Sequence, residues 1–265
     1  MEKQNRQASG PATENDPTSQ SYNWAITPPR RQRKAGGQIL SINSGKCVDA
    51  EWTQRRGRTA IEKRALTSSC TVTELGIQGD EQAADFHGGR LQAVYAYARE
   101  DLDWWSDELG RPLRNGMFGE NLDLTGFDVS GAALGERWQA GEVLLEVMAP
   151  RMACGTFGAW MGETGWAKRF NDARRPGAYL RVVREGKLSV DDSVHMVWQP
   201  QQRVTVAESV GAILGDHEVL RRIHALAEQV PAWDKTAMMF HVSNRTNAKA
   251  KGSGETLTSV PPGAG

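Results

Sequence analysis

The chain of 265 residues has few cysteines, and none of them are paired in sequence. Cys47, Cys70 and Cys154 include no C-x-x-C motif, which argues against a structural zinc site. An odd and sparse set of cysteines also argues against the disulfide framework of a small secreted protein.

The sequence also lacks net charge and long apolar runs. Its 32 Lys and Arg residues balance its 32 Asp and Glu residues, so we expect no nucleic acid partner. No apolar run approaches the roughly 18 residues that a membrane-spanning helix needs, so we expect no membrane association. Residues 1–20 are polar and contain no apolar signal region, which favours a cytoplasmic protein.

Both ends of the chain have little to bury. Residues 1–36 are rich in Gln, Asn, Ser, Thr, Pro and charge, and residues 249–265 are rich in Gly, Ser, Thr and Pro. Such compositions predict disordered tails. The basic patch at 28–34 is typical of a solvated tail, although it could also contact an acidic partner.

Short strands dominate the middle of the sequence. Apolar and polar residues alternate over Gln38–Asn43, and strands are also predicted over 59–66, 71–73, 92–97 and 143–148. Strands and glycine turns continue to Trp198, without the regular alternation of βαβ units. We therefore predict a mainly β (α+β) fold in which residues 38–198 form a barrel-like sheet.

One helix is predicted inside this β-rich region. Asp101, Asp103 and Asp107 would lie on its polar side, and Leu102, Trp105 and Leu109 have the spacing of a buried side. Gly110 and Pro112 would end it.

A small helical extension is predicted over 204–241. Residues 206–214 have helical periodicity after Thr205, a good N-cap, and residues 218–227 form a second amphipathic pattern. Residues 232–240 could form a third helix.

Cys154 lies where a strand gives way to a turn. Pro150 cannot continue a sheet ladder, so the strand 143–148 should end there. Arg151 brings a fixed positive charge near the thiol and favours thiolate, the form that binds soft metals. Gly155 allows the backbone to approach a ligand. The alternative is a small buried apolar residue at a strand end, and the local sequence leaves both open.

His87, Gly88 and Gly89 form a second candidate. Paired glycines between strands predict a tight turn with accessible backbone N–H groups that can hold an anion, and His87 could donate a hydrogen bond or act as an acid. A purely structural turn is the alternative.

Glu120 and Asn121 follow a turn that starts at Gly116. A carboxylate and an amide at such a place can bind a polar heterocycle, or they can satisfy their own loop backbone. Lys63 and Arg64 would point to opposite faces of a strand, so one of them could reach a phosphate.

Taken in order, these segments resemble the MOSC domain family, related to the C-terminal domain of molybdenum cofactor sulfurases, and in particular its YiiM-like branch. The resemblance covers about 38–198 and rests on Leu40–Asn43, Thr59–Lys63, Gly79–Ala83, His87–Gly89 with Ala93–Tyr95, Gly116–Leu122, Pro150–Cys154 and Gly177–Val183. The helical segment from about 204 to 240 resembles the C-terminal extension of the same branch.

The resemblance implies a barrel-like core that binds the molybdenum cofactor, a pterin dithiolene that carries a phosphate. Cys154 matches the cysteine that is associated with the metal, and thiolate is a suitable soft ligand. Members of the branch are linked to the reduction of N-hydroxylated compounds, such as hydroxylaminopurines, to amines. An external electron-donating reductase is then expected, because the sequence shows no flavin, haem or iron–sulfur motif.

This reading gives each candidate residue a role. Cys154 would bind the metal and, with His87, form the catalytic pair, while Lys63 and Arg151 would hold the anionic cofactor. Gly88 and Gly89 would supply N–H donors. The last two candidates, Glu120 and Asn121, would bind the pterin or a small-molecule substrate.

Two positions depart from the family pattern. Ala153 stands where the family often has proline, which leaves the turn less rigid. Leu91 stands where an acidic residue is common, so an orienting contact is lost. Asp85 is assigned no role.

Other readings stay open at this point. The chain could be a carrier that holds the cofactor or a persulfide on Cys154 without turnover of its own. Cys154 with His87 as base could also form a thiol hydrolase. Pyridoxal phosphate, sometimes suggested for this domain class, would bind Lys63, but no residue pattern independently supports it. The natural substrate, the electron donor and the oligomeric state are not encoded in any motif.

Overall fold

The computed structural model describes residues 36–53, 57–83 and 88–227. The predicted tail 249–265, residues 1–35 of the predicted tail 1–36, His87 and Asp85 lie outside these ranges, while Gly36 begins a strand. Thirteen strands occur in the described residues. They are β1 (Gly36–Ser44), β2 (Val48–Asp49), β3 (Arg58–Thr59), β4 (Arg64–Ala65), β5 (Cys70–Thr73), β6 (Gly76–Ile77), β7 (Val94–Ala98), β8 (Leu122–Thr125), β9 (Arg137–Ala140), β10 (Val143–Pro150), β11 (Ala178–Arg184), β12 (Gly186–Leu188) and β13 (Ser193–Trp198).

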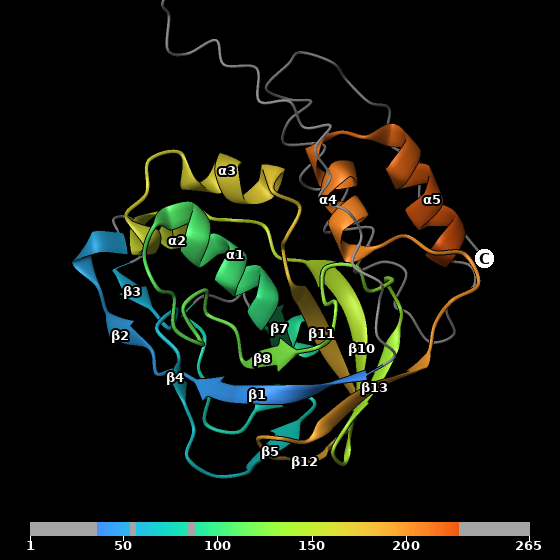
Figure 1. The fold of residues 1–265 in the computed structure, drawn as a ribbon, viewed down its shortest axis with the longest axis horizontal. Coiled ribbons are helices and arrows are strands. Elements are labelled where there is room, and N and C mark those ends of the chain that lie inside the picture. Colours follow the sequence, from blue (N-terminus) through green and yellow to red (C-terminus); the bar gives the residue numbers. More distant parts are fainter. Residues whose placement is uncertain (1–35, 54–56, 84–87, 228–265) are drawn as a thin grey trace, which may run out of the picture. The chain divides into compact units, whose positions relative to one another are not determined.

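Seven of these strands close into a barrel, as the β-rich sequence predicted. Their order is β13-β9-β10-β11-β7-β8-β1, and β1 pairs with β13 to complete the circle. Neighbouring strands in this ring are antiparallel except β7 and β8, which run parallel. Closure removes the exposed sheet edge that an open sheet of this size would present. Figure 1 shows β1 crossing below β8 and meeting β13.

The buried residues form two clusters of different character. One is mostly aliphatic, lines the strands and extends to the C-terminal helices. The other, which we call the aromatic cluster, consists of Tyr95, Tyr97, Leu102, Trp105, Leu113, Phe118, Phe157, Met161, Trp166 and Phe170. Its rings meet mainly edge to face, with centroids 4.7–6.4 Å apart. The candidate site lies beside this aromatic cluster.

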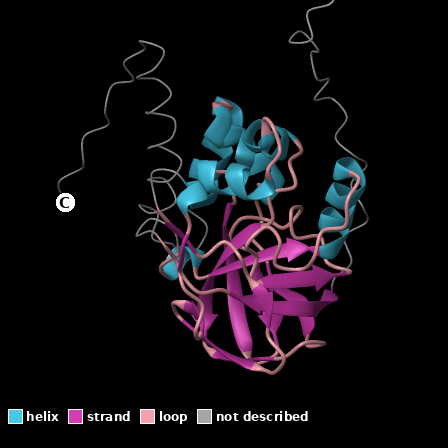
Figure 2. Cartoon of the chain, turned by 90° about the vertical axis from the view of Figure 1, so that its left-hand side faces the viewer, coloured by secondary structure: helices cyan, strands magenta, loops and turns pink. Residues whose placement is uncertain are grey.

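Three helices gather at one end of the barrel, which Figure 2 shows as cyan coils above magenta strands. They are α1 (Arg99–Leu109), α2 (Gly155–Met161) and α3 (Trp166–Asp172). The prediction of α1 is confirmed, including its end at Gly110, which adopts the left-handed conformation. One detail was wrong: Asp101 is buried rather than solvated, because Arg175 and Ser130 bind its carboxylate.

The sequence analysis missed α2 and α3. Both are only seven residues long, and glycines occupy the positions just before, within or after them. Glycine is a poor helix former, so neither segment shows a strong helical signal. Their formation depends on tertiary packing of Phe157, Trp166 and Phe170 in the aromatic cluster.

The predicted strand 59–66 is correct only at its ends. β3 stops at Thr59 and β4 begins at Arg64, while residues 60–63 pack against the turn that starts at Gly116. Lys63 is buried and Arg64 is exposed, so the two side chains do diverge as expected.

The helical extension begins with α4 (Val206–Leu214) and α5 (His217–Ala227). Thr205 caps α4 as predicted: its side chain accepts a hydrogen bond from the Glu208 amide, and Glu208 accepts one from the Thr205 amide. The third predicted helix lies outside the described residues. Within the described ranges, no helix combines the length and apolar character needed to cross a membrane.

Candidate functional site

The turn from Gly116 to Glu120 is the structural base of the site. Gly116 and Gly119 have φ values of 74° and 77°. A Cβ atom on Gly116 would lie 2.8 Å from the Lys63 carbonyl oxygen, and one on Gly119 would lie 3.2 Å from an Ile61 side-chain carbon. Only glycine allows both the positive φ and this close approach. The turn is therefore fixed against residues 60–63.

Arg151 lies buried between this turn and the aromatic cluster. Its guanidinium donates a hydrogen bond to the Phe118 carbonyl oxygen and lies 4.3 Å from the centre of the Phe157 ring and 5.0 Å from that of Tyr95. Among the described residues it forms no ion pair with a carboxylate. Burial opposes the charge, but Tyr179, Tyr95 and the Cys154 thiol nearby raise the pKa of Arg151, so it stays a cation.

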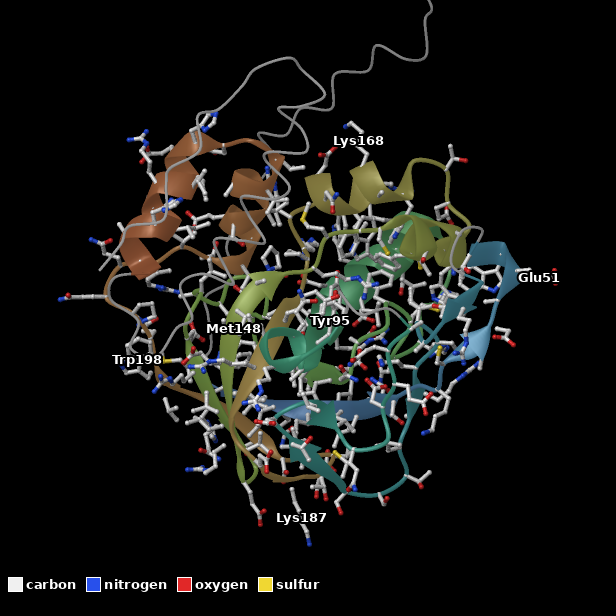
Figure 3. The ribbon with its side chains drawn as sticks, turned by 180° about the vertical axis from the view of Figure 1, so that it is seen from behind. Glu51, Tyr95, Met148, Lys168, Lys187 and Trp198 are labelled. Carbon is white, nitrogen blue, oxygen red and sulfur yellow. The ribbon has the colours of Figure 1, made fainter. Side chains whose placement is uncertain are left out.

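Tyr95 marks the interior side of this arrangement and is labelled in Figure 3. It comes from β7, is 2% exposed, and donates its hydroxyl hydrogen to the Pro176 carbonyl oxygen at 2.8 Å. Burial raises the pKa of Tyr95 well above its ordinary value, so the phenol stays neutral. Arg151 thus faces neutral aromatic rings, which attract a cation but do not neutralise it.

Cys154 is the N-cap residue of α2. Its carbonyl oxygen accepts a hydrogen bond from the Gly158 amide at 2.9 Å, and its half-buried side chain packs at the margin of the aromatic cluster. It is close enough to Arg151 to influence the pKa of the guanidinium, as the sequence predicted from their spacing. A Cβ atom on the next residue, Gly155, would meet no atom within 4 Å, so this side of the turn is open.

Lys63 is buried and held by Asp80. Its ammonium group donates to both carboxylate oxygens, at 2.5 and 2.7 Å. Burial lowers the pKa of Lys63, and Asp80 opposes that shift, while Arg151 adds to it. The Asp80 carboxylate also accepts hydrogen bonds from the Gly45 amide and from the Asn121 side chain. Lys63, which was predicted to bind the cofactor, thus already has a carboxylate partner in Asp80.

Asn121 has all its side-chain groups engaged. Its amide nitrogen donates to Asp80 and to the Asn43 carbonyl oxygen, and its oxygen accepts from the Tyr95 backbone amide at 3.0 Å. Glu120 is also fully buried, and one carboxylate oxygen accepts from the Gly116 amide at 2.7 Å. Both residues hold the turn and its neighbours together, and their predicted contact with a ligand stays a prediction.

The glycine turn before β7 is described only from Gly88 onward, because His87 lies outside the described residues. Gly88 and Gly89 have φ values of 80° and 74°, so this turn requires glycine. Leu91, where the family often has an acidic residue, packs half-buried against the aliphatic cluster.

Ala153, the second departure, has a specific contact. Its backbone amide donates to the Asn171 side chain of α3 at 3.1 Å. Proline has no amide hydrogen and could not make this bond. In this chain, which has no proline at position 153, a hydrogen bond therefore joins the Cys154 turn to α3.

Four polar residues of the site were not singled out from the sequence: Asn43, Asp80, Asp123 and Tyr95. Asp123 could have been found from the sequence, because a carboxylate between Leu122 and Leu124 is unusual in an apolar strand. All three residues are buried in the structure. For the other three, no local pattern separates them from ordinary strand or turn residues.

The donor set suits a metal that brings ligands of its own. Within the described residues, no three His, Cys, Asp or Glu side chains are grouped to hold a metal ion. A dithiolene-bound metal needs only one further protein ligand, and a single soft thiol at Cys154 fits that need. The buried positive charge of Arg151 fits the negative charge of such a cofactor.

Comparison with known proteins bears on the family of this chain. A family model described as the MOSC domain matches residues 83–195. The protein YflK of Bacillus subtilis strain 168 is 29% identical over 169 residues, covering 63% of this chain and 76% of its own length. The protein YiiM of Escherichia coli strain K12 is 28% identical over 194 residues, covering 71% of this chain and 86% of its own.

A solved structure and a larger fungal protein extend the comparison. The crystal structure of YiiM from Geobacillus stearothermophilus superposes with a TM-score of 0.64 and 25% identity, covering 79% of this chain and 98% of that one. A protein of Gibberella moniliformis named "Reductase" is 28% identical over 206 residues, which are 75% of this chain but only 36% of that protein. The family-model match, the relatives YflK and YiiM and the solved YiiM structure together support a YiiM-like member of the MOSC domain family.

Proposed function

We propose that this protein is a molybdenum cofactor-dependent oxidoreductase that reduces small N-hydroxylated compounds, such as hydroxylaminopurines, to amines. The observation that carries the proposal is the proximity of a buried cation, Arg151, which has no carboxylate partner among the described residues, to a half-buried thiol, Cys154, three residues later. Unpaired buried charges are rare in a folded core and are expected where a ligand supplies the opposite charge.

Each residue then has a separate task. Cys154 supplies the soft protein ligand at the open side of the turn, and Arg151 supplies the positive charge. Lys63 adds a second positive charge nearby, partly balanced by Asp80. When bound, the cofactor supplies the electron transfer, and the protein supplies binding, orientation and electrostatics. Aromatic residues around Arg151 exclude water and strengthen its interaction with an anion.

The overall reaction consumes two electrons and two protons. The N–O bond of a hydroxylamine breaks, the nitrogen gains one hydrogen in place of the hydroxyl group, and the hydroxyl takes the other proton and leaves as water. An external reductase would supply the electrons. The name of the fungal relative supports a reductive reaction, and the family's association with the molybdenum cofactor supports the metal.

The test is turnover of 6-N-hydroxylaminopurine by protein made in a host that synthesises the cofactor. We expect wild-type protein, with a chemical electron donor, to form the amine, and the Cys154→Ala variant to form none. Cys47→Ala is the matched control, since Cys47 is the other half-buried thiol of the described chain. A wild-type protein that contains molybdenum but gives no amine would instead support the carrier reading.

A further inference from the structure

Glu120 and Asp123 form a buried acidic pair behind the site. Both residues are fully buried, with 0% of their surface exposed. Each influences the pKa of the other through a direct side-chain contact. Two carboxylates in contact and out of water would repel each other strongly if both were ionised.

The hydrogen bonds of Asn43 determine which oxygens are already in use. Its side-chain oxygen accepts from the Ser41 hydroxyl at 2.8 Å, and its side-chain nitrogen donates to the Glu120 backbone carbonyl at 3.2 Å. A backbone carbonyl can only accept, so the orientation of the amide is fixed. Its nitrogen therefore also donates to Oδ2 of Asp123, at 2.7 Å.

One oxygen on each acid is left over. Oε1 of Glu120 accepts from the Gly116 amide at 2.7 Å. Oε2 of Glu120 and Oδ1 of Asp123 are both buried, and within the described residues no N–H or O–H group donates to either of them. Because the bonded oxygens must act as acceptors, a proton on this pair has its place between the two remaining oxygens.

We infer that Glu120 and Asp123 share one proton between Oε2 and Oδ1 at neutral pH, and that this protonated pair fixes the turn on which Arg151 and α2 rest. Glu120 closes the turn through Gly116. The same turn accepts hydrogen bonds from Arg151 at the Phe118 carbonyl and from Trp160 of α2 at the Met117 carbonyl. The pair is thus a positioning device for the Cys154 helix.

Charged groups around the pair do not take over the role of the proton. Lys63, Arg99, Arg114 and Arg151 all influence one or both acids electrostatically, but their hydrogen bonds go elsewhere. Lys63 donates to Asp80, and Arg99 donates to Asp103 and Asn115. Arg114 donates to the backbone carbonyls of Lys63 and Asn115, and Arg151 donates to the Phe118 carbonyl. Tyr95 and Tyr97 also face Glu120 and stay neutral. Burial and then the charge of Glu120 raise the pKa of Asp123 to about 9, in agreement with a shared proton.

The first test is a double-mutant cycle with amide replacements. In Asp123→Asn the new amide nitrogen can donate to Oε2 of Glu120, and in Glu120→Gln it can donate to Oδ1 of Asp123, so each single variant keeps the bond without a proton. The double variant sets two amide donors against each other. We expect a coupling of roughly tenfold or more in the unfolding equilibrium constant, measured in urea at pH 7. Additive effects would overturn the inference.

The second test is the pH dependence of stability. The pKa of Asp123 is higher in the folded state than its ordinary value of 3.8, so the stability it contributes is complete below that value and declines as pH rises toward about 9. Asp123→Asn removes this titration. We expect the variant to gain stability over wild type steadily between these pH values and to show no protonated-carboxyl band in the infrared spectrum. Parallel pH curves would contradict a shared proton.

The third test asks whether the pair positions α2, and it needs no cofactor. We would alkylate the protein with iodoacetamide at one pH and quantify each cysteine peptide by mass spectrometry. Cys154 should be alkylated several-fold faster in the double variant than in wild type, while in Asp123→Asn it should be alkylated at the wild-type rate. Cys70, buried in β5 and paired with β12, reports global unfolding and should stay protected in all three proteins. Equal Cys154 rates would remove the positioning role without affecting the proposed function.

Discussion

Two buried acidic regions of this molecule are balanced in opposite ways. In the barrel wall, Glu146 is completely buried, and its two oxygens accept from Arg137 at 2.6 Å and from Arg181 at 2.9 Å. The strand register places all three side by side on β9, β10 and β11. At the helical end of the barrel, Glu120 and Asp123 have no such partner, and Arg151 has no carboxylate of its own in the described structure.

This difference separates structural charge from functional charge. An acid held by two arginines is complete, and nothing more needs to bind there. A buried guanidinium surrounded by neutral aromatic rings, next to an acid pair neutralised by a proton, leaves net positive charge available for a ligand. The same chain therefore completes its ionic contacts in the wall, whereas at the site it pairs Lys63 with Asp80 and leaves Arg151 without a carboxylate among the described residues.

The largest expected effect comes from breaking the complete network. Glu146→Ala leaves two partly buried arginines without a counter-charge, which should cost about 3–5 kcal/mol of unfolding free energy. Urea denaturation measures this loss. The pair of Arg99 and Asp103, in which the carboxylate is exposed, provides the control, because Asp103→Ala should cost less than about 1 kcal/mol. Similar losses in the two variants would show that Glu146 is not a structural charge.

Arg151→Met should have a smaller effect on stability and a large effect on binding. The change removes one hydrogen bond and leaves the Phe118 carbonyl without its partner, so we expect about 1–2 kcal/mol. Molybdenum content should fall at the same time, since the positive charge is lost. A stability loss as large as that of Glu146→Ala, with metal content unchanged, would show that the charge of Arg151 has a structural role only.

Thr205→Ala tests a polar contact that is complete and belongs to the helical extension. The capping box with Glu208 satisfies the first turn of α4, so its loss should cost about 1 kcal/mol. Molybdenum content should not change. Thermal unfolding with metal analysis of the same sample checks both, and a loss of metal would show that the extension supports the site.

The smallest effect is expected at the surface of α3. Lys168 and Asp172 form an i,i+4 ion pair that is largely exposed, so Lys168→Ala should change the unfolding free energy by at most about 0.5 kcal/mol. This variant sets the baseline for the others. A loss above about 1 kcal/mol would mean that α3 is held more tightly by its charged side than by Trp166 and Phe170.

Local patterns in the sequence were enough to predict much of the fold. The alternation in β1, the helical spacing of α1 and the Thr205 cap each depend on neighbouring residues, and each is confirmed. The helices α2 and α3 were missed because their stability comes from contacts with distant aromatic residues. Asp101 was misread for the same reason, since its partner Arg175 is 74 residues away.

The site was predictable in part. Cys154 and Arg151 are neighbours in sequence, so their proximity followed from spacing alone. The contacts of Lys63 with Asp80 and of Asn43 with Asp123 join segments 17 and 80 residues apart, and only the closed barrel brings them together. Sequence therefore showed which side chains carry chemistry, but not which of them already have partners.

The most direct measurement is molybdenum per chain, by elemental mass spectrometry, in wild type, Cys154→Ala and Cys47→Ala made in a host that synthesises the cofactor. The account predicts molybdenum in wild type and in Cys47→Ala, and little in Cys154→Ala. Equal metal in all three proteins, or none in any, would contradict the assignment of Cys154 as the ligand.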